Sequence, residues 1–522
     1  MSNTGEIARK TTLDKDLAKL SQIEEATSFL ARGLVAPGLA LFFLALVAVA
    51  VAVFTAGDPG AIAIVAAAAI GAYMALNIGA NDVANNVAPA VGSRALTMGG
   101  ALIMAAFFET AGALIAGGDV VDTISKGIID PDSVAAPGVF VSAMMAALLA
   151  SAVWVNLATA IGAPVSTTHS VVGGVMGAGI ASAGFAAVNW PVMSGIAASW
   201  VISPFLGGII AALFLAFVKS RIIYQDDKIA AARRWVPLLI GIMAGAFAAY
   251  LATKGLKKIV HLPGMQIAAI GVGAFLLAWG VSHVHVARQS ASMENRNQSL
   301  RKLFGLPLVI SAALLSFAHG ANDVANAVGP LAAIVQTATH GELAAVVAIP
   351  FWVMLIGAVG ISLGLLLFGP KLVRMVGEQI TKLNPMRAFC VALSAALTVI
   401  VASWFGLPVS STHIAVGAVF GVGFFREWYT ANSPRRRAYL ERKAVRLRNE
   451  RKQSNGEPAG TTADMDDDEE EDALPSAARE EARRRKLVRR AHFSTIVAAW
   501  VVTVPSTALI AALIFHALNL LS

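Results

Sequence analysis

The stretch GANDVANNVAPAVGS, residues 79–93, places an Asn-Asp pair beside glycine in the middle of an apolar segment. Residues 320–334 repeat the pattern as GANDVANAVGPLAAI. The chain around them has 522 residues, of which 57% are hydrophobic and 14% charged, whereas ordinary soluble domains carry roughly 25% charged residues. Apolar runs of about 20 residues, long enough to cross a membrane as a helix, recur along it. The composition therefore predicts an all-α polytopic membrane protein.

A second motif also occurs twice, as GAPVSTTHSVVGGVMG at 162–177 and GLPVSSTHIAVGAVFG at 406–421. The copies of the first motif are offset by 241 residues (320 − 79), and those of the second by 244 (409 − 165). Two motifs in the same order at nearly the same offset indicate a duplicated unit. We predict a first repeat over 60–218 and a second over 306–521. A linker over 219–305 carries two more spans, and an extra span at 36–56 follows an N-terminal segment, 1–35.

Basic loop residues predict how the repeats are oriented, because Lys and Arg favour the cytoplasmic side of a membrane. We place the N-terminus inside and expect re-entrant helical hairpins at 137–160 with 168–185 and at 388–405 with 411–425. Short inside loops then hold 19 Lys and Arg residues, and outside loops hold four. This path inverts one repeat relative to the other. It makes the charged insert 426–491 a cytoplasmic, solvated linker, with a regulatory docking role as the alternative. We expect the chain to lie in a plasma membrane of the bacterial inner-membrane type.

Neither charge nor cysteine content indicates another class of partner. The net charge of +8 reflects basic residues in these loops and the insert, so it does not indicate nucleic acid. The single cysteine, Cys390, offers neither a disulfide framework nor a Cys-based metal site. The HVH triplet at 283–285 is not expected to bind metal, because residues i and i+2 do not face each other on a helix.

The first motif predicts a helix broken near the middle of the membrane in each repeat, since it combines glycine, asparagine and proline. Unwound backbone survives at that depth only where it is buried in protein or lines a wet cavity. Asp82 and Asp323 add carboxylates to the exposed carbonyl groups, and Asn81 and Asn322 add amide oxygens. These are ligands for a small cation such as Na⁺, or carboxylates for a proton. We therefore predict a coupling-ion site; helix breaking without ion contact is the alternative.

The second motif places proline and then hydroxyl residues where a hairpin arm begins, which is a helix-start signal. The N–H groups and the dipole of a helix start favour an anion. One copy would indicate ordinary capping, but two copies beside an acidic motif in an inverted repeat favour a site at the repeat interface. The arrangement predicts co-transport of a tetrahedral oxyanion with cations that offset its charge. The residues predicted to bind the anion are Ser166, Thr167, Thr168, Ser410, Ser411 and Thr412.

The doubled motifs resemble those of the inorganic phosphate transporter (PiT) family, over about 60–218 and 306–521. The resemblance implies cation-coupled phosphate symport in a homodimer, with the coupling ion and phosphate on the residues named above. It also implies supporting roles for Glu109, in AFFETAGALIAG, and for His319, just before the second GANDVAN. His169 and His413, which follow the hairpin tips, are expected to be structural.

Several alternatives stay open. Ala392 occupies a position where eukaryotic members of the family carry glutamate, so their Na⁺ scheme does not transfer residue by residue, and Na⁺ and H⁺ both remain candidates. Relatives that carry sulfate or a neutral metal–phosphate complex leave the cargo open. An anion channel is the alternative of another class, although duplicated helix breaks suit alternating access better than a continuous pore. No enzyme and no cofactor beyond the co-transported ion are expected, because the chain lacks a GxxxxGK[ST] loop and an HExxH helix.

Overall fold

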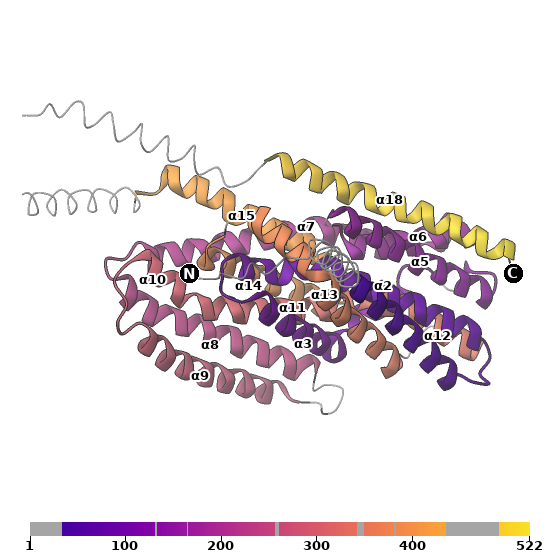
Figure 1. Cartoon of the computed structure of the whole chain (residues 1–522), viewed down its shortest axis with the longest axis horizontal. Helices are drawn as coiled ribbons and strands as arrows, with labels where there is room; N and C mark the ends of the chain where they lie inside the picture. Colours follow the sequence, from indigo (N-terminus) through magenta and orange to yellow (C-terminus); the bar gives the residue numbers. More distant parts are fainter. Residues whose placement is uncertain are drawn as a thin grey trace, which may run out of the picture.

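The computed structural model describes residues 34–521 apart from 131–132, 164, 256–259, 261, 342–348, 380–382 and 435–489. The N-terminal segment and most of the charged insert predicted above therefore lie outside the described residues. The described part is nearly all helical, and eleven of its helical segments are long and apolar enough to cross a membrane. The predicted class, an all-α polytopic membrane protein, is confirmed (Figure 1).

The helices have the following order along the predicted segments of the chain. An apolar helix, Leu34–Phe54, precedes the first repeat. The first repeat contains α2 (Ala61–Gly92), α3 (Met98–Ala116), α4 (Gly118–Lys126), α5 (Pro137–Ile161), α6 (Thr167–Ala183) and α7 (Trp190–Val218). The linker contains α8 (Lys228–Lys254), α9 (Gly264–Gln289) and α10 (Asn297–Leu303). The second repeat contains α11 (Gly305–Asp323), α12 (Ala325–His340), α13 (Phe351–Gln379), α14 (Pro385–Trp404), α15 (Ser411–Asn432) and α18 (Arg490–Leu521).

The two repeats interlock, because helices of one pack on helices of the other. Helix α2 packs on α13 and α11 on α3, while α6 packs on α18 and α15 on α7. At Gly79, on α2, an added Cβ would lie 1.9 Å from the carbonyl oxygen of Ile361. At Gly320, 241 residues later, an added Cβ would lie 2.1 Å from the carbonyl oxygen of Glu109. The close contacts thus recur at the offset of the sequence repeat. The opposite orientation of the repeats in a membrane stays a prediction.

The predicted helix break is wrong for the first copy of the GANDVAN motif, and in the second copy it is limited to one residue. Helix α2 runs without interruption through residues 79–85. In the second copy of the GANDVAN motif, only Val324 separates α11 from α12, and its φ of −57° and ψ of −30° are still helical. The motif glycines serve close helix packing instead, and Pro89 and Pro330 are accommodated inside α2 and α12. Proline is tolerated in membrane helices where neighbouring groups satisfy the freed backbone. The polar groups that the GANDVAN motif offers to a ligand are therefore those of its side chains.

The two predicted hairpins are present as helix–turn–helix units, α5 with α6 and α14 with α15. The turns begin at Gly162 (φ 75°) and Gly406 (φ 67°), in the left-handed region that glycine adopts without strain. Ser166 and Ser410 then cap α6 and α15, and each side-chain oxygen accepts a hydrogen bond from the backbone three residues later, at 3.1 and 3.3 Å. How deep the tips lie in a membrane stays a prediction.

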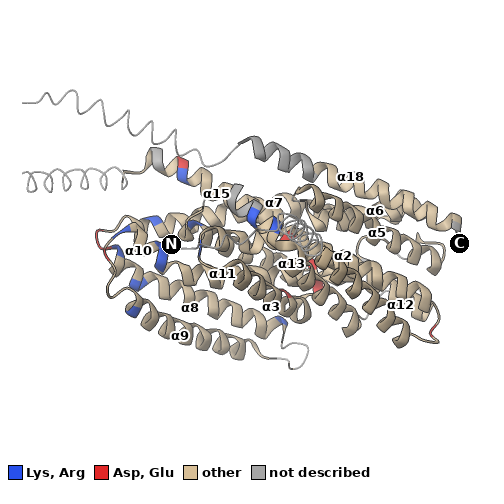
Figure 2. Cartoon of the chain, in the orientation of Figure 1, with Lys and Arg blue, Asp and Glu red and all other residues tan. Residues whose placement is uncertain are grey.

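Burial places the second GANDVAN motif at the centre of the molecule. Of the most apolar window in Gly305–His340, 89% is buried, whereas the corresponding figure for α9 is 6%. Helices α8 and α9 lie side by side along one edge, and α18 lies along the opposite edge (Figure 1). Lys and Arg residues gather at one end of the bundle, around α10 and the adjoining ends of α8 and α9 (Figure 2). We refer to this as the basic end.

Candidate functional site

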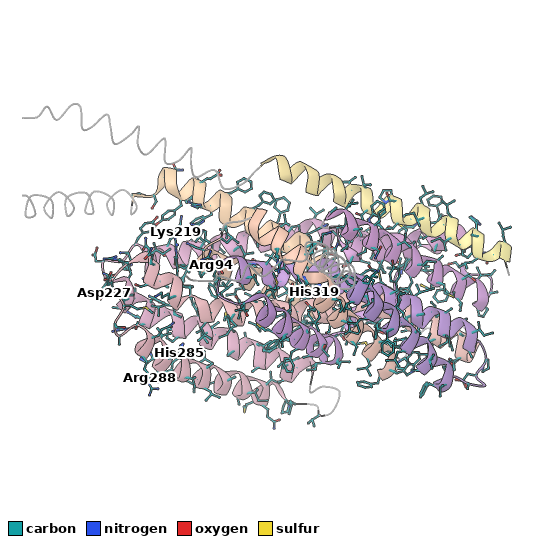
Figure 3. All side chains as sticks on the ribbon, in the orientation of Figure 1. Arg94, Lys219, Asp227, His285, Arg288 and His319 are labelled. Carbon is teal, nitrogen blue, oxygen red and sulfur yellow. The ribbon has the colours of Figure 1, made fainter. Side chains whose placement is uncertain are left out.

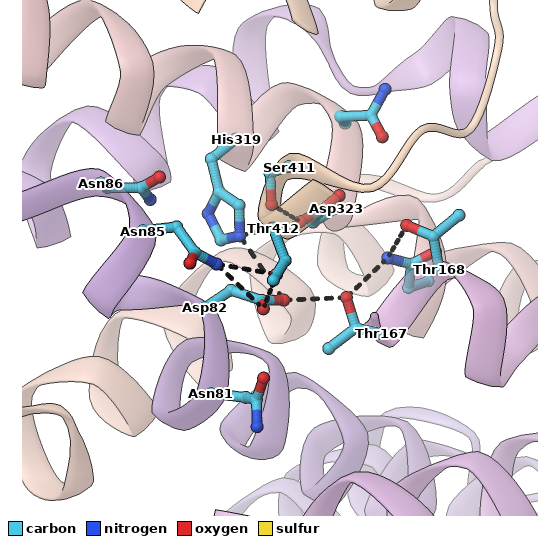
Figure 4. Close-up of polar contacts among 12 residues, drawn as sticks. Asn81, Asp82, Asn85, Asn86, Thr167, Thr168, His319, Asp323, Ser411 and Thr412 are labelled. Carbon is cyan, nitrogen blue, oxygen red and sulfur yellow. Dashed lines mark hydrogen bonds and ion pairs between the residues drawn. The ribbon is translucent and has the colours of Figure 1, made fainter. Parts of the chain in front are cut away.

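Asp82, on α2, receives hydrogen bonds from the hairpin tips of both repeats. Its carboxylate is 1% exposed. Oδ2 accepts from Thr167 Oγ1 at 2.8 Å, at the start of α6, and Oδ1 accepts from Thr412 Oγ1 at 3.0 Å, on α15 (Figure 4). The acidic motif and the hairpin tips therefore meet at one place, as the sequence analysis predicted.

Asp323 occupies the equivalent place in the second repeat. Its Oδ2 accepts from Ser411 Oγ at 3.1 Å, just as Asp82 accepts from Thr167. Both pairs are buried. The carboxylates thus engage the first residue of the hairpin helix in their own repeat, while Thr412 adds a bond across the repeat interface to Asp82.

His319 joins the acidic groups of the site. Its ring is fully buried, with Nε2 2.8 Å from Asp323 Oδ2 and 3.8 Å from Asp82 Oδ2. On the other side of the ring, Nδ1 lies 3.2 Å from Glu109 Oε1. His319 lies in the middle of the bundle, whereas Arg94 and Lys219 lie toward the basic end (Figure 3). Glu109, His319 and the two aspartates therefore form one continuous polar cluster.

This cluster breaks the symmetry of the repeats. The residue equivalent to His319 at the offset of 241 is Ile78. Glu109 packs its carbonyl against Gly320, and the residue that packs its carbonyl against the equivalent Gly79 is Ile361. Each half thus supplies one member of the pair, His319 or Glu109, where the other half has an isoleucine, Ile78 or Ile361. The protein has one acid–imidazole pair beside two aspartates, not two copies of it.

Two asparagines that the sequence analysis did not include complete the hydroxyl cluster. Asn85 Nδ2 donates to Thr412 Oγ1 at 2.8 Å. Asn326, its equivalent, donates through Nδ2 to Thr168 Oγ1 at 3.2 Å. The signal was present in the motif, because the last Asn of GANDVAN follows Asp by three residues in both copies. Residues three apart lie on the same face of a helix.

Several oxygen atoms in the cluster are buried without a hydrogen-bond donor. Leaving such atoms unpaired is costly, and ligation of a cation would satisfy them. Asn86 Nδ2 donates to Glu109 Oε1 at 2.7 Å, so an amide and a carboxyl group adjoin there. Asp323 and Asn326 lie three residues apart in the second motif copy, and each carries one such oxygen. The unpaired atoms are Asn86 Oδ1, Glu109 Oε2, Asp323 Oδ1 and Asn326 Oδ1.

The structure places Asn81 and Asn322 against the hairpin tips. Asn322 Nδ2 donates to Ser403 Oγ at 2.9 Å, and its Oδ1 accepts from Val409 N at 3.2 Å. Asn81 lies 2.9 Å from the hydroxyl of Thr159, the residue equivalent to Ser403. Both amides thus hold the hairpin of their own repeat, which favours a positioning role over direct cation ligation.

The six hydroxyl residues predicted to bind the anion differ in their contacts. Thr167, Ser411 and Thr412 point at carboxylates, as described above. Thr168 Oγ1 donates to the carbonyl oxygen of Val409 at 3.0 Å, which ties one hairpin tip to the other. Ser166 and Ser410 cap their helices. Behind the tips, the rings of His169 and His413 lie 4.4 Å apart, and Trp200 packs on the former at 3.8 Å, contacts that suit the structural role expected for them.

This fold and site define a multi-pass membrane protein with hydroxyl, amide, carboxyl and imidazole groups gathered at its centre. The model of the phosphate transporter family matches residues 78–511, and the chain belongs to that family. It is a family of transporters, not enzymes, so the resemblance predicted from the two motifs is confirmed.

Known proteins are similar over most of the chain. A protein of Helicobacter pylori strain J99 named "Putative phosphate permease" is 44% identical, over 97% of this chain and 99% of that protein. A protein of the same description from Pyrococcus abyssi is 38% identical over 68% of this chain and 87% of its own length. A solved structure titled "The sodium-dependent phosphate transporter" has a TM-score of 0.74 and 33% identity, covering 88% of this chain and all of that one.

Proposed function

We propose that the protein imports inorganic phosphate by cation-coupled symport with alternating access. The observation that carries the proposal is the convergence of hydroxyl groups from both hairpins on Asp82, at 2.8 and 3.0 Å. A site built equally from two interlocked repeats is one that their relative motion can open to either side. Transporters made of repeated units bind their substrates at such interfaces.

Phosphate recognition is assigned to the hydroxyl groups and to the helix starts behind them. Thr167, Ser411 and Thr412 exchange their bonds to carboxylates for bonds to phosphate oxygens, and the N-termini of α6 and α15 add partial positive charge. Phosphate is protonated near neutral pH, so one of its O–H groups can donate to Asp82 or Asp323. Sulfate has no such proton at that pH, which favours phosphate as the cargo.

Coupling to a cation follows from the charges at the site. The polar contacts described above involve three carboxyl groups and no Lys or Arg side chain. Bringing a further anion among buried carboxylates is unfavourable unless positive charge enters with it. Na⁺ would occupy the unpaired oxygens, and protons would occupy the Glu109–His319–Asp323 chain. No cofactor besides the co-transported cation is proposed.

Uptake of labelled phosphate into proteoliposomes tests the proposal. An inward Na⁺ gradient, an inward proton gradient and no gradient are compared, with sulfate as competitor. We expect phosphate to accumulate above its external concentration with one of the two gradients and sulfate to compete weakly. Uptake that only equilibrates under every gradient would indicate a channel and contradict symport.

A metal–phosphate complex is the second candidate cargo. Asp82, His319 and Asp323 bring one ligand atom each within 4.8 Å of one another. An imidazole with two carboxylates suits a divalent transition metal better than it suits Na⁺. If the complex is the cargo, a chelator stops phosphate uptake and labelled Mn²⁺ enters only together with phosphate. Full uptake in the presence of chelator argues against it.

The assembly and location proposed with this function are a homodimer in a plasma membrane of the bacterial inner-membrane type, with the N-terminus in the cytoplasm. The many exposed apolar side chains on the described spans fit a lipid environment. Mass measurement of the purified protein in nanodiscs tests the dimer: a mass of one chain per disc at every protein concentration would contradict it.

A further inference from the structure

Two adjoining cavities at the basic end form a surface that we call the basic basin. The larger has a volume of about 860 Å³ and the smaller about 280 Å³, and both are lined by Arg301, Asn384 and Arg387. The cationic residues gathered at this end are visible in Figure 2. Six of them line the basin: Arg94, Lys219, Arg301, Lys302, Arg387 and Arg426.

The described lining of the basin is cationic. Six of its residues are Lys or Arg, and none of the described residues that line either cavity is acidic. The cations come from the end of α2, the turn after α7, α10, α14 and α15, which are far apart in sequence. The preference of basic residues for the cytoplasmic side accounts for their presence at this end. It does not account for their convergence on one cavity from separate elements. An anion bound there would contact several of them at once.

Arg94 and the start of α14 also favour an anion in the basic basin. Among the described residues, Arg94 is the non-glycine residue with positive φ (61°), and it stands where α2 ends, a position that favours glycine. The chain thus places a cation in the basin lining at some conformational cost. Asn384 caps α14 by accepting from Arg387 N at 3.0 Å, so the positive end of a 20-residue helix also faces the cavity.

We propose that the basic basin binds an anion that carries two or more phosphate groups. The larger cavity is within the range of about 300–1,000 Å³ typical of small-molecule sites, which is more space than a single phosphate needs. Arginine binds phosphate through two parallel hydrogen bonds, and several arginines on different elements suit several phosphates. The ligand can be a soluble polyphosphate or the headgroup of a lipid with two phosphates. Basic pockets between membrane helices bind such headgroups.

The basin is distinct from the proposed transport site. It begins at Gly92, ten residues after Asp82, or about 15 Å along α2. The transport site offers hydroxyl, amide and carboxyl groups, whereas the basin offers cations. The proposal therefore goes beyond phosphate transport, and either one can fail without the other. A ligand in the basin would hold the end of the helix that carries Asp82.

Binding to the full-length protein in phosphatidylcholine nanodiscs tests the proposal, with two probes. Inorganic tripolyphosphate is titrated calorimetrically, and cardiolipin added to the discs is counted on the protein by native mass spectrometry. We expect at least one probe to bind the wild type. The double variant Arg94→Gln, Arg301→Gln should bind at least about tenfold more weakly, since each lost charged hydrogen bond alone has about that effect. Which probe binds distinguishes a soluble ligand from a lipid.

Three control variants keep the result interpretable. Arg94→Lys with Arg301→Lys retains both charges but loses the paired hydrogen bonds of arginine, so its affinity should lie between those of the wild type and the double Gln variant. Arg288→Gln removes an exposed cation of the same end that lines neither cavity, and Asp82→Asn disables the transport site; both should bind like the wild type. The proposal is overturned if neither probe binds the wild type, if Arg288→Gln weakens binding as much as the double variant, or if Asp82→Asn abolishes binding.

Discussion

Asp82 combines three properties that seldom occur together in a membrane helix: a carboxyl group, near-complete burial and hydrogen bonds from two separate hairpins. A carboxylate is costly to bury in such a position, so a role in function is the default interpretation. The amide of asparagine has almost the same shape but no charge. That substitution therefore separates the charge of the residue from its packing.

We expect Asp82→Asn to reduce phosphate uptake at least about 100-fold, because two hydrogen bonds to a charged group, each worth about 1.5–3 kcal/mol, are weakened and a cation ligand is lost. Initial rates in proteoliposomes measure the effect. Asp119→Asn is the matched control, since the Asp119 side chain is half exposed and pairs with Lys254. Uptake by Asp82→Asn at the rate of that control would contradict the assignment of Asp82.

Asn85 should matter for substrate affinity, although it was not predicted as a site residue. Its Nδ2 donates to Thr412 at 2.8 Å and so orients that hydroxyl group toward Asp82. Losing one neutral hydrogen bond costs about 1 kcal/mol, which is roughly a fivefold rise in KM. We expect this from Asn85→Ala in concentration-dependent uptake, with Asn432→Ala, an exposed residue, unchanged. An unaltered KM would contradict a role for Asn85 in substrate binding.

The two motifs predicted which polar residues lie together, because both carry chemistry that an apolar span does not otherwise need. Asp82, Asp323 and the hydroxyl tips were predicted together and lie together. The contacts of Asn81 and Asn322 were beyond prediction, since they depend on where each hairpin tip lies against its helix. Glu109 and His319 were named through a family resemblance, and their pairing was not predicted, because no spacing in one chain shows that α3 crosses α11.

At the scale of helices, glycine in the GANDVAN motif is compatible with either a helix break or a close helix–helix contact. We read it as a helix breaker, and the structure shows it as a contact point. Gly364 and Gly112 face the carbonyl oxygens of Leu76 and Phe317, each at 2.0 Å from an added Cβ, and so repeat the pattern of the motif glycines. Small residues of this kind allow membrane helices to approach closely. Sequence periodicity alone does not distinguish a break from a crossing.

The crossing of α2 with α13 should therefore fail when a methyl group is added. In Gly79→Ala the new Cβ meets backbone of Ile361, which cannot move aside as a flexible side chain can. We expect a loss of stability of about 1–3 kcal/mol or more, as for overpacked cores, seen as a lower midpoint of thermal unfolding in detergent. Gly280→Ala, on α9, meets nothing within 4 Å and should leave the midpoint unchanged or raise it. Equal midpoints for the two variants would contradict a contact role for Gly79.

At the scale of the whole molecule, the acid–imidazole pair occurs once, with Glu109 from the first repeat and His319 from the second, and so makes the two halves chemically unequal. Equivalent hairpins supply equivalent hydroxyl groups for the anion, whereas Glu109 and His319 exist once. The proposed substrate site is thus nearly symmetric, whereas Glu109 and His319, which we propose compensate the charge, have no equivalents. We infer that both repeats hold phosphate and that the cluster beside α3 determines which cation accompanies it.

The orientation of the molecule in the membrane is the last prediction. The basic end holds Arg94, the loop before α10 and the start of α14, and Lys and Arg favour the cytoplasm. In a Cys390→Ala background, which removes the single native thiol, we expect Asn297→Cys to be protected from an impermeant maleimide in intact cells. Asp58→Cys, at the opposite end of α2, should be labelled. Both should react after permeabilisation, which shows that each thiol is accessible in itself. Labelling of Asn297→Cys alone in intact cells would reverse the predicted topology, and it would place the basic basin on the outer side, where a cytoplasmic ligand could not reach it.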